Sequence, residues 1–260
     1  MFDFLKRKPK TAQPIFEDLA IDMHCHLLPR VDDGSKSEEE TAACMRIMKD
    51  AGFGRLFCTP HFQYPRFPNV EEDIVDRYEN LKLDLVASGA GGRDLPRLTG
   101  ISGEYRIDSD FQKRIEKDRF LLIGGKYLLV ELSLHQRIMG VEQILFDLQM
   151  KGYEIILAHP ERYPYYSSSS HVLSHFKDMG ILFQINILSL GGFYGEGPRR
   201  KSFDMLANGW IEFMGTDMHN LLYAQALIDC THDKKIEKVM ATHTFHNKSI
   251  VDAESLQKKL

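Results

Sequence analysis

His24 and His26 stand two residues apart, at the point where the apolar segment 19–23 ends. Residues two apart on a β-strand point to the same side of the sheet, so both imidazoles can meet one cation, while Cys25 between them points the other way. Imidazole nitrogen is a common ligand of transition metals. The spacing therefore predicts a metal site at the end of a first strand.

The same pattern recurs along the chain, because one apolar run after another is followed by His, Asp or Glu. Later in the chain, the strand ends and the residues after them supply Asp32 and Asp33, His61, Glu104, Glu131, His159 and Glu161, and Asp217 and His219. In a (β/α) barrel the carboxyl ends of the parallel strands converge on one face, and catalytic groups come from several strands. Carboxylates gathered there would repel one another without cations. The sequence thus predicts a shared metal centre, to which the run ending at Asn186 offers no obvious ligand.

Seven apolar runs alternate with amphipathic stretches, which is typical of βα units around a parallel sheet and predicts an α/β fold. The expected strands are 20–24, 55–59, 97–103, 127–132, 153–158, 181–186 and 211–215. Ser37 and Glu40 have the spacing of a capping box and predict a helix that continues to about residue 51. Further helices are expected at 70–87, 140–151, 170–179, 199–208 and 220–229.

Composition favours a single globular domain. The 260 residues carry 43% hydrophobic side chains and a formal net charge of −4, which argues against a dedicated nucleic-acid binder. The four cysteines are far apart, so no disulfide framework is expected. No apolar run is long enough to span a membrane, and no signal peptide is apparent, so we expect a cytoplasmic protein. The expected domain covers 19–245, between a flexible basic tail at 1–18 and a second tail at 246–260.

Six motifs together resemble the PHP (polymerase and histidinol phosphatase) superfamily. They are Asp22-Met-His-Cys-His26 with Leu28-Pro-x-x-Asp-Asp-Gly34, Thr59-Pro-His61, Gly103-Glu104, Glu131, Ala158-His-Pro-Glu-Arg162 and Gly215-Thr-Asp-Met-His-Asn220. More closely, they are similar to bacterial manganese-dependent tyrosine-protein phosphatases of the CpsB/YwqE type, which work beside capsule and exopolysaccharide synthesis. The resemblance implies the PHP fold, a distorted seven-stranded (β/α) barrel.

The resemblance also implies two or three metal ions, with Mn²⁺ expected and Fe²⁺ or Zn²⁺ possible. His24, His26, Glu104 and Asp217 would hold the first, and Glu104 would bridge to a second that also takes Glu131 and His159. Asp33, His61 and His219 would hold the third. The substrate would be a phosphotyrosine protein, with the tail of a bacterial tyrosine kinase as the expected partner.

The expected nucleophile is a metal-bound hydroxide, and catalysis is assigned to Arg162, Glu104 and Asp217. Arg162 is the candidate phosphate clamp, because its guanidinium offers a planar fork to two oxygens, and Arg106 is a second candidate. The family usually has another phosphate-contacting Arg after the last motif, where this chain has 221–225 without one. Segment 199–201, Arg-Arg-Lys, could replace it or could be a solvated helix start.

Cysteine-based phosphatase chemistry is excluded by spacing. It requires Cys-x5-Arg, whereas the residues six beyond the four cysteines are Val31, Asp50, Tyr64 and Ile236. Two alternatives to a tyrosine phosphatase stay open: a PHP phosphoesterase for a small phosphorylated metabolite, and a non-catalytic regulator of a tyrosine kinase. The regulator would be expected to lose ligands, and none of the inferred positions is lost.

Overall fold

The structure is a computed structural model that describes residues 10–89, 94–167 and 171–250. Its strands in chain order are β1 (Ile21–Cys25), β2 (Arg55–Cys58), β3 (His61–Phe62), β4 (Arg97–Ile101), β5 (Glu104–Arg106), β6 (Tyr127–Glu131), β7 (Glu154–Ala158), β8 (Leu182–Asn186) and β9 (Phe213–Gly215). All paired neighbours run parallel. The predicted α/β class is therefore confirmed.

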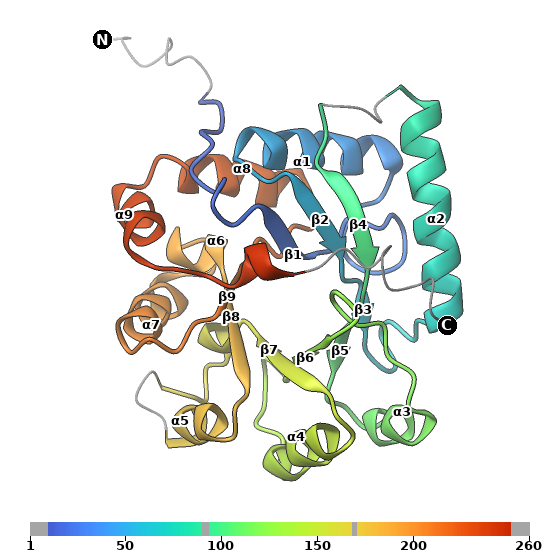
Figure 1. Ribbon diagram of the computed structural model, residues 1–260, viewed down its shortest axis with the longest axis vertical. Helices are drawn as coiled ribbons and strands as arrows, with labels where there is room; N and C mark the ends of the chain where they lie inside the picture. The colour runs from blue at the N-terminus through green and yellow to red at the C-terminus, as the bar shows by residue number, and fades with distance from the viewer. Residues whose placement is uncertain (1–9, 90–93, 168–170, 251–260) are drawn as a thin grey trace.

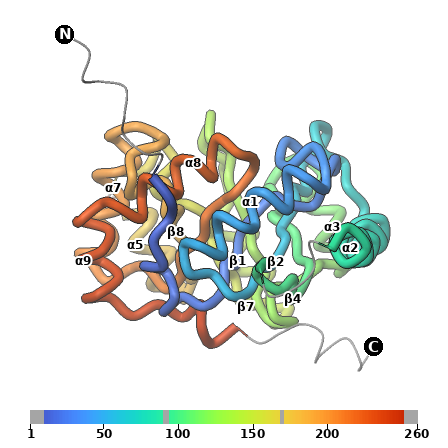
Figure 2. Tube along the Cα trace, turned by 90° about the horizontal axis from the view of Figure 1, so that it is seen from above, coloured from blue at the N-terminus to red at the C-terminus, as the bar shows by residue number. Residues whose placement is uncertain are grey.

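Helices surround the strands (Figure 1). The α-helices are α1 (Glu38–Asp50), α2 (Glu71–Ala87), α3 (Phe111–Lys117), α4 (Val141–Met150), α5 (His171–Asp178), α6 (Ile187–Leu190), α7 (Glu196–Ala207), α8 (Leu221–Cys230) and α9 (Lys234–Thr242). Two 3-10 turns are η1 (Pro160–Arg162) and η2 (Asn247–Ser249). Helices α7 and α9 lie on the opposite side of the molecule from α2 and α3, as Figure 2 also shows.

The predicted count of seven strands is not confirmed. The described residues form two sheets, ordered β1-β2-β4 and β3-β5-β6-β7-β8-β9, with nine strands in all. Each of the seven predicted runs contains a strand, but β3 and β5 are additional short ones. Pro60, which has no N–H to donate, separates β3 from β2, and residues 102–103 separate β5 from β4.

Main-chain hydrogen bonds connect the two sheets at both sides. On one side, Ser102 N donates to the oxygen of Cys58 at the end of the first sheet, and Glu104 N, in the second sheet, donates to the oxygen of Pro60, which directly precedes β3. On the other side, Cys25 forms an isolated parallel bridge with Met218, just after β9. The carboxyl ends of β1 and β9 are thus held beside each other.

The helix predictions are confirmed where the sequence has a clear capping residue or a clear periodicity. The Ser37 hydroxyl accepts a hydrogen bond from Glu40 N, and α1 ends at residue 50. Helix α2 buries the four residues expected from its spacing, Ile74, Tyr78, Leu81 and Leu85. Helix α7 begins three residues earlier than predicted, and α3, α6 and α9 were not predicted.

Packing extends past both predicted domain boundaries. Phe16 is fully buried and stacks on Phe53, with ring centroids 5.6 Å apart. Asn247 is also fully buried. The remainder of the predicted tails, 1–9 and 251–260, lies outside the described residues. Among the helices that the structure describes, none combines the length and the apolar character needed to cross a bilayer.

Candidate metal centre

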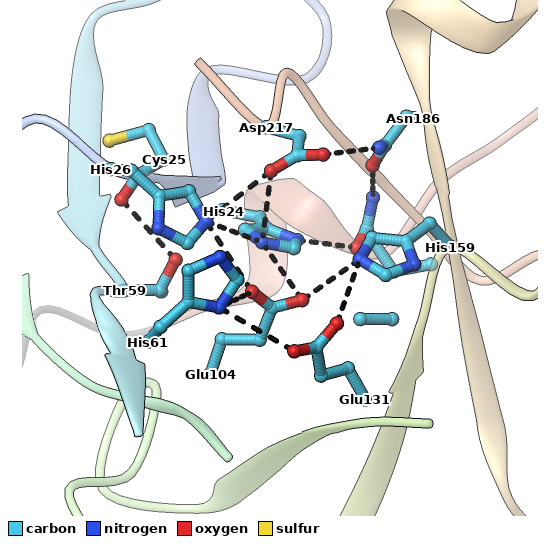
Figure 3. Close-up of polar contacts among 12 residues, drawn as sticks. His24, Cys25, His26, Thr59, His61, Glu104, Glu131, His159, Asn186 and Asp217 are labelled. Carbon is cyan, nitrogen blue, oxygen red and sulfur yellow. Dashed lines mark hydrogen bonds and ion pairs between the residues drawn. The ribbon is translucent and has the colours of Figure 1, made fainter. Parts of the chain in front are cut away.

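The predicted donor residues meet in one cluster, most of which Figure 3 shows. His61 and Glu104 begin the short strands β3 and β5, whereas the other donors lie at or after the carboxyl ends of β1, β6, β7 and β9. Ligand atoms of His24, His26 and Asp217 lie within 4.8 Å of one another, as do those of three further sets. These further sets are His24, Glu104 and His159; His61, Glu104 and Glu131; and His26, His61 and His219. Because the sets share members, the cluster is continuous.

His24 in β1 and His26, directly after it, face each other. Their Nε2 atoms are 3.2 Å apart, and each Nδ1 is fixed by a buried side chain, 2.8 Å from Gln184 Oε1 for His24 and 2.8 Å from Asp32 Oδ2 for His26. The register of β1 against β2 shifts between Asp22 and Cys25, which re-aims the side chains there. Cys25 points away, as predicted, and donates to the oxygen of Phe57.

Glu104, at the start of β5, is the central carboxylate. Its Oε1 lies 2.9 Å from His159 Nε2 and 3.4 Å from His24 Nε2, while its Oε2 lies 2.9 Å from His61 Nδ1. Glu131, at the end of β6, lies 3.6 Å from His61 Nδ1 and 4.0 Å from His159 Nε2. Both carboxylates are buried.

Asp217 and Asp33 complete the cluster on the side of His219. Asp217 Oδ1 lies 3.3 Å from His26 Nε2 and 3.5 Å from His219 Nδ1. Asp33 Oδ1 lies 3.6 Å from His219 Nε2 and 3.4 Å from His61 Nε2. The structure thus brings all nine predicted donors together.

The donor set fits divalent cations. Four buried polar atoms of these residues make no hydrogen bond of normal geometry within the described residues: Asp33 Oδ1, His61 Nδ1, Glu104 Oε2 and His159 Nδ1. His61 Nδ1 and Glu104 Oε2 face each other at 2.9 Å without the angles of a hydrogen bond. Buried polar atoms of this kind are costly unless something satisfies them. Facing imidazole nitrogens and crowded carboxylate oxygens are satisfied together by a cation, and mixed N and O ligands suit Mn²⁺, Fe²⁺ or Zn²⁺.

Burial and crowding shift the pKa values of these groups. Burial lowers the pKa of His159 to about 4, so its ring is neutral and has a lone pair to offer. Burial, with the neighbouring Glu104, raises the pKa of Glu131 to about 7. Burial also disfavours ionised Asp217, but His219, His26 and His24 hold its pKa well below the usual range.

Two members of the cluster have a strained backbone. His159 has φ of 34° and Asp217 has φ of 54°, in the left-handed region that residues other than glycine seldom adopt. His159 leads directly into η1, and Asp217 follows β9. Strain of this kind persists where the surrounding structure enforces it, and it concentrates at functional sites.

A pocket of about 260 Å³ opens over the cluster. The donors that line it are Asp33, His61, Glu131, His159, Asp217 and His219, and its arginines are Arg66, Arg106 and Arg162. Arg162 donates to Asp217 Oδ2 at 2.8 Å and lies over the ring of Tyr194. Arg106 lies 3.5 Å from Glu131 Oε1. Both predicted phosphate-binding arginines therefore border the cluster.

Segment 199–201 does not line this pocket. Arg199 pairs with Asp233, and Lys201 donates to the oxygen of Tyr163. Arg200 and Lys201 border a separate hollow of about 600 Å³, to which Arg162 also contributes. His135, four residues after Glu131, is exposed and does not line the pocket either.

Several residues around the donors were not predicted. Asn186 is no ligand candidate but donates to Asp217 Oδ2 at 2.7 Å, and Gln184 donates to Asn186. Their spacing of two on β8 was the available signal, since it turns two polar side chains toward the same interior. Tyr194 donates to Asp217 at 3.1 Å, and Tyr223 stacks on His219.

The cysteines take no part in the cluster. All four are buried with free thiols, and burial raises the pKa of Cys44 and of Cys230 to about 12. A thiolate nucleophile is therefore disfavoured.

Comparison with known families shows to which family the chain belongs. Residues 20–256 match the family model described as "Capsular polysaccharide synthesis, CpsB/CapC". The chain belongs to the CpsB/CapC family. All nine clustered donors and the three pocket arginines fall within the matched residues.

Relatives within this family carry phosphatase names. Tyrosine-protein phosphatase YwqE of Bacillus subtilis (strain 168) is 28% identical over 202 residues, covering 77% of this chain and 78% of the relative. Tyrosine-protein phosphatase CpsB of Streptococcus pneumoniae is 29% identical over 206 residues, covering 77% and 83%.

Solved structures show the shared fold. The crystal structures of YwqE from Bacillus subtilis and CpsB from Streptococcus pneumoniae, described as metal-dependent tyrosine phosphatases, include a chain with a TM-score of 0.73. It is 24% identical, and the match covers 89% of this chain and 94% of that one. The phosphotriesterase homology protein of Escherichia coli, at 12% identity, reaches a TM-score of 0.50.

Proposed function

We propose that this protein is a metal-dependent protein-tyrosine phosphatase that hydrolyses phosphotyrosine in a protein substrate. The observation that carries the proposal is the cluster of nine imidazole and carboxylate donors under a pocket bordered by three arginines. The tyrosine-phosphatase names of the family members support it. A role in capsule or exopolysaccharide regulation follows from the family description.

We propose the predicted grouping of ligands for two or three divalent ions, with Mn²⁺ as the expected metal. His24, His26, Glu104 and Asp217 form one group. Glu104, Glu131 and His159 form the second, and Asp33, His61 and His219 the third. The distances within each group support the assignment. Divalent ions would supply charge stabilisation for a phosphoryl group and a lowered pKa for bound water.

Protein groups then orient the substrate. Arg162 is rigidly placed, because Asp217 accepts its hydrogen bond and Tyr194 lies against its guanidinium plane. We propose that it clamps the phosphoryl oxygens, with Arg106 beside it. Gln184 and Asp32 hold the rings of His24 and His26 in orientation. A tyrosine phenolate leaves readily, since its conjugate acid has a pKa of about 10, so little proton donation is required.

We also propose that the two sheets act as one distorted (β/α) barrel. The hydrogen bonds between residues 102–104 and 58–60, together with the Cys25–Met218 bridge, support this arrangement. A barrel brings the strand ends to a common face, which accounts for donors supplied by strands from β1 to β9.

The test is hydrolysis of p-nitrophenyl phosphate and of a phosphotyrosine peptide, with and without added Mn²⁺. We expect activity that depends on the metal and a loss of at least about 100-fold in Glu104→Ala, because the central carboxylate disappears. Glu71→Ala is the control, because Glu71 pairs with Arg114 and neither residue lines this pocket. Full activity in Glu104→Ala would contradict the bridging assignment.

The two alternatives give different results in the same assay. A metabolite phosphoesterase would hydrolyse histidinol phosphate far faster than the phosphopeptide. A non-catalytic regulator of a tyrosine kinase would hydrolyse neither substrate at any Mn²⁺ concentration. The expected partner, a bacterial tyrosine kinase tail, would be captured by a ligand variant that binds its substrate without turnover.

A further inference from the structure

Each of the three pocket arginines is paired with a different carboxylate of the cluster. Arg162 lies 2.8 Å from Asp217, Arg106 lies 3.5 Å from Glu131, and Arg66 lies 3.0 Å from Asp33. Sequence reasoning singled out the first two but not Arg66. The pairing matters because a carboxylate that binds a divalent ion no longer needs a guanidinium to balance its charge.

The main chain around Arg66 is held firmly. Gln63 and Phe67 exchange two backbone hydrogen bonds, of 3.0 and 2.6 Å, which close the turn that carries Arg66. Tyr64 N donates to Asp108, and the Asn69 side chain donates to the oxygens of His61 and Val31. The turn is thereby fixed to β3, the strand that begins with His61.

The Arg66 side chain, in contrast, is open to solvent. It is 62% exposed, whereas Arg106 is 14% and Arg162 is 19% exposed. Its guanidinium lies 4.8 Å from the Phe67 ring centroid, and that ring stacks on His61 with an interplanar angle of 5°. The Arg66 side chain therefore stands at the mouth of the pocket, where its guanidinium contacts Asp33 and the Phe67 ring and is also open to solvent.

Contacts link Arg66 to Arg162 along the wall of the pocket. They pass from Asp33 to His219 and from His219 to Asp217, which accepts from Arg162. Arg66 and Arg162 both line the pocket over these donors, and an arginine side chain has several rotatable bonds and a forked head that suits phosphoryl oxygens.

We propose that Arg66 is a phosphate-binding residue that leaves Asp33 and contacts a phosphoryl oxygen of the bound substrate. This inference rests on the proposed phosphatase function. Asp33 holds Arg66 over the pocket in the absence of cations. When a cation shares the charge of Asp33, the guanidinium is available to the dianionic phosphoryl group, and charge-assisted hydrogen bonds are the strong ones.

The test compares Arg66→Gln and Arg66→Lys with the native protein in the presence of saturating Mn²⁺. Arg30→Gln is the matched control, because Arg30 is 59% exposed and also pairs with a carboxylate, Glu38, away from this pocket. Calorimetry measures the binding of inorganic phosphate. Hydrolysis of p-nitrophenyl phosphate gives KM and kcat, and titration gives the affinity for Mn²⁺.

We expect Arg66→Gln to weaken phosphate binding and raise KM by about tenfold, with kcat and Mn²⁺ affinity changed by less than about threefold. Arg66→Lys should recover part of the loss, and Arg30→Gln should behave as the native protein. Unchanged phosphate affinity in Arg66→Gln would overturn the inference. A loss of phosphate affinity accompanied by an equal loss of Mn²⁺ affinity would also overturn it.

The phosphate-binding measurement also separates this inference from the proposed function. If the native protein binds phosphate through Arg66 yet hydrolyses neither substrate, the phosphatase proposal fails and the oxyanion site stands. If it hydrolyses both substrates while Arg66→Gln retains native phosphate affinity, the phosphatase proposal stands and the role of Arg66 fails.

Discussion

At the scale of single residues, the donors depend on neighbours that hold their rings and carboxylates in place. Asp32 shows this most clearly, since its Oδ2 lies 2.8 Å from His26 Nδ1 and also accepts from His61 N, while its Oδ1 accepts from Gly34 N. Such outer contacts fix the tautomer of a ligating histidine and its direction. Asp32 therefore positions two of the proposed ligands without being one of them.

Replacing Asp32 with Asn is expected to weaken Mn²⁺ binding by about 10 to 100 fold, because the amide keeps the shape but loses the charge that orients His26. Calorimetric titration with Mn²⁺ measures the change. Asp84→Asn, at an exposed position on α2, should leave the affinity as it is. Native affinity in Asp32→Asn would show that His26 needs no such partner.

At the scale of elements, the cluster depends on holding β1 beside β9, at opposite ends of the chain. Asn247 of η2 does this from outside the sheet. Its Nδ2 donates to the oxygens of Ile21 and Met214, and its Oδ1 accepts from Met214 N at 3.0 Å. One buried amide thus satisfies backbone groups of both strands.

We expect Asn247→Ala to lower the free energy of unfolding by on the order of 3 kcal/mol, because it leaves several buried backbone groups without partners. Urea unfolding followed by circular dichroism measures this loss. Asn208→Ala, at an exposed position after α7, serves as the control. A loss below about 0.5 kcal/mol, the range of ordinary surface substitutions, would contradict the bridging role.

At the scale of the whole molecule, the cluster gathers negative charge that only the folded chain can concentrate. Asp33, Glu104, Glu131 and Asp217 come from four separate segments of the chain. Three buried atoms of this cluster, Asp33 Oδ1, His61 Nδ1 and Glu104 Oε2, make no hydrogen bond of normal geometry within the described residues. A cation that binds here binds the native state and not the unfolded chain. Metal binding and folding are therefore coupled.

Mn²⁺ at a concentration 100 times its Kd should raise the free energy of unfolding by about 2.7 kcal/mol relative to the metal-free protein. The corresponding rise in Tm is roughly 5 to 10 °C. Differential scanning calorimetry with and without a chelator measures the shift. In Glu104→Ala the shift should be much smaller. An unchanged Tm in the native protein at every Mn²⁺ concentration would show that the cluster holds no such ion.

Local patterns in the sequence predicted the α/β class, the position of each main strand and the strand-end residues among which the nine proposed donors lie. Those signals are short-range, since alternation, capping and strand-end residues depend on a few neighbours each. Short elements escaped prediction, because β3 has two residues and α6 has four, too few to show a period.

Only the tertiary structure decided which polar residues meet the donors. Gln184, Asn186 and Tyr194 reach the cluster from β8 and the segment after α6, and Arg66 reaches it from a turn closed by backbone hydrogen bonds. The spacing of two on β8 indicates only that Gln184 and Asn186 share a face, and no local pattern encodes which distant residues they contact. The sequence by itself predicted the donors, whereas the packing of strands and turns selected their partners and the direction in which each side chain points.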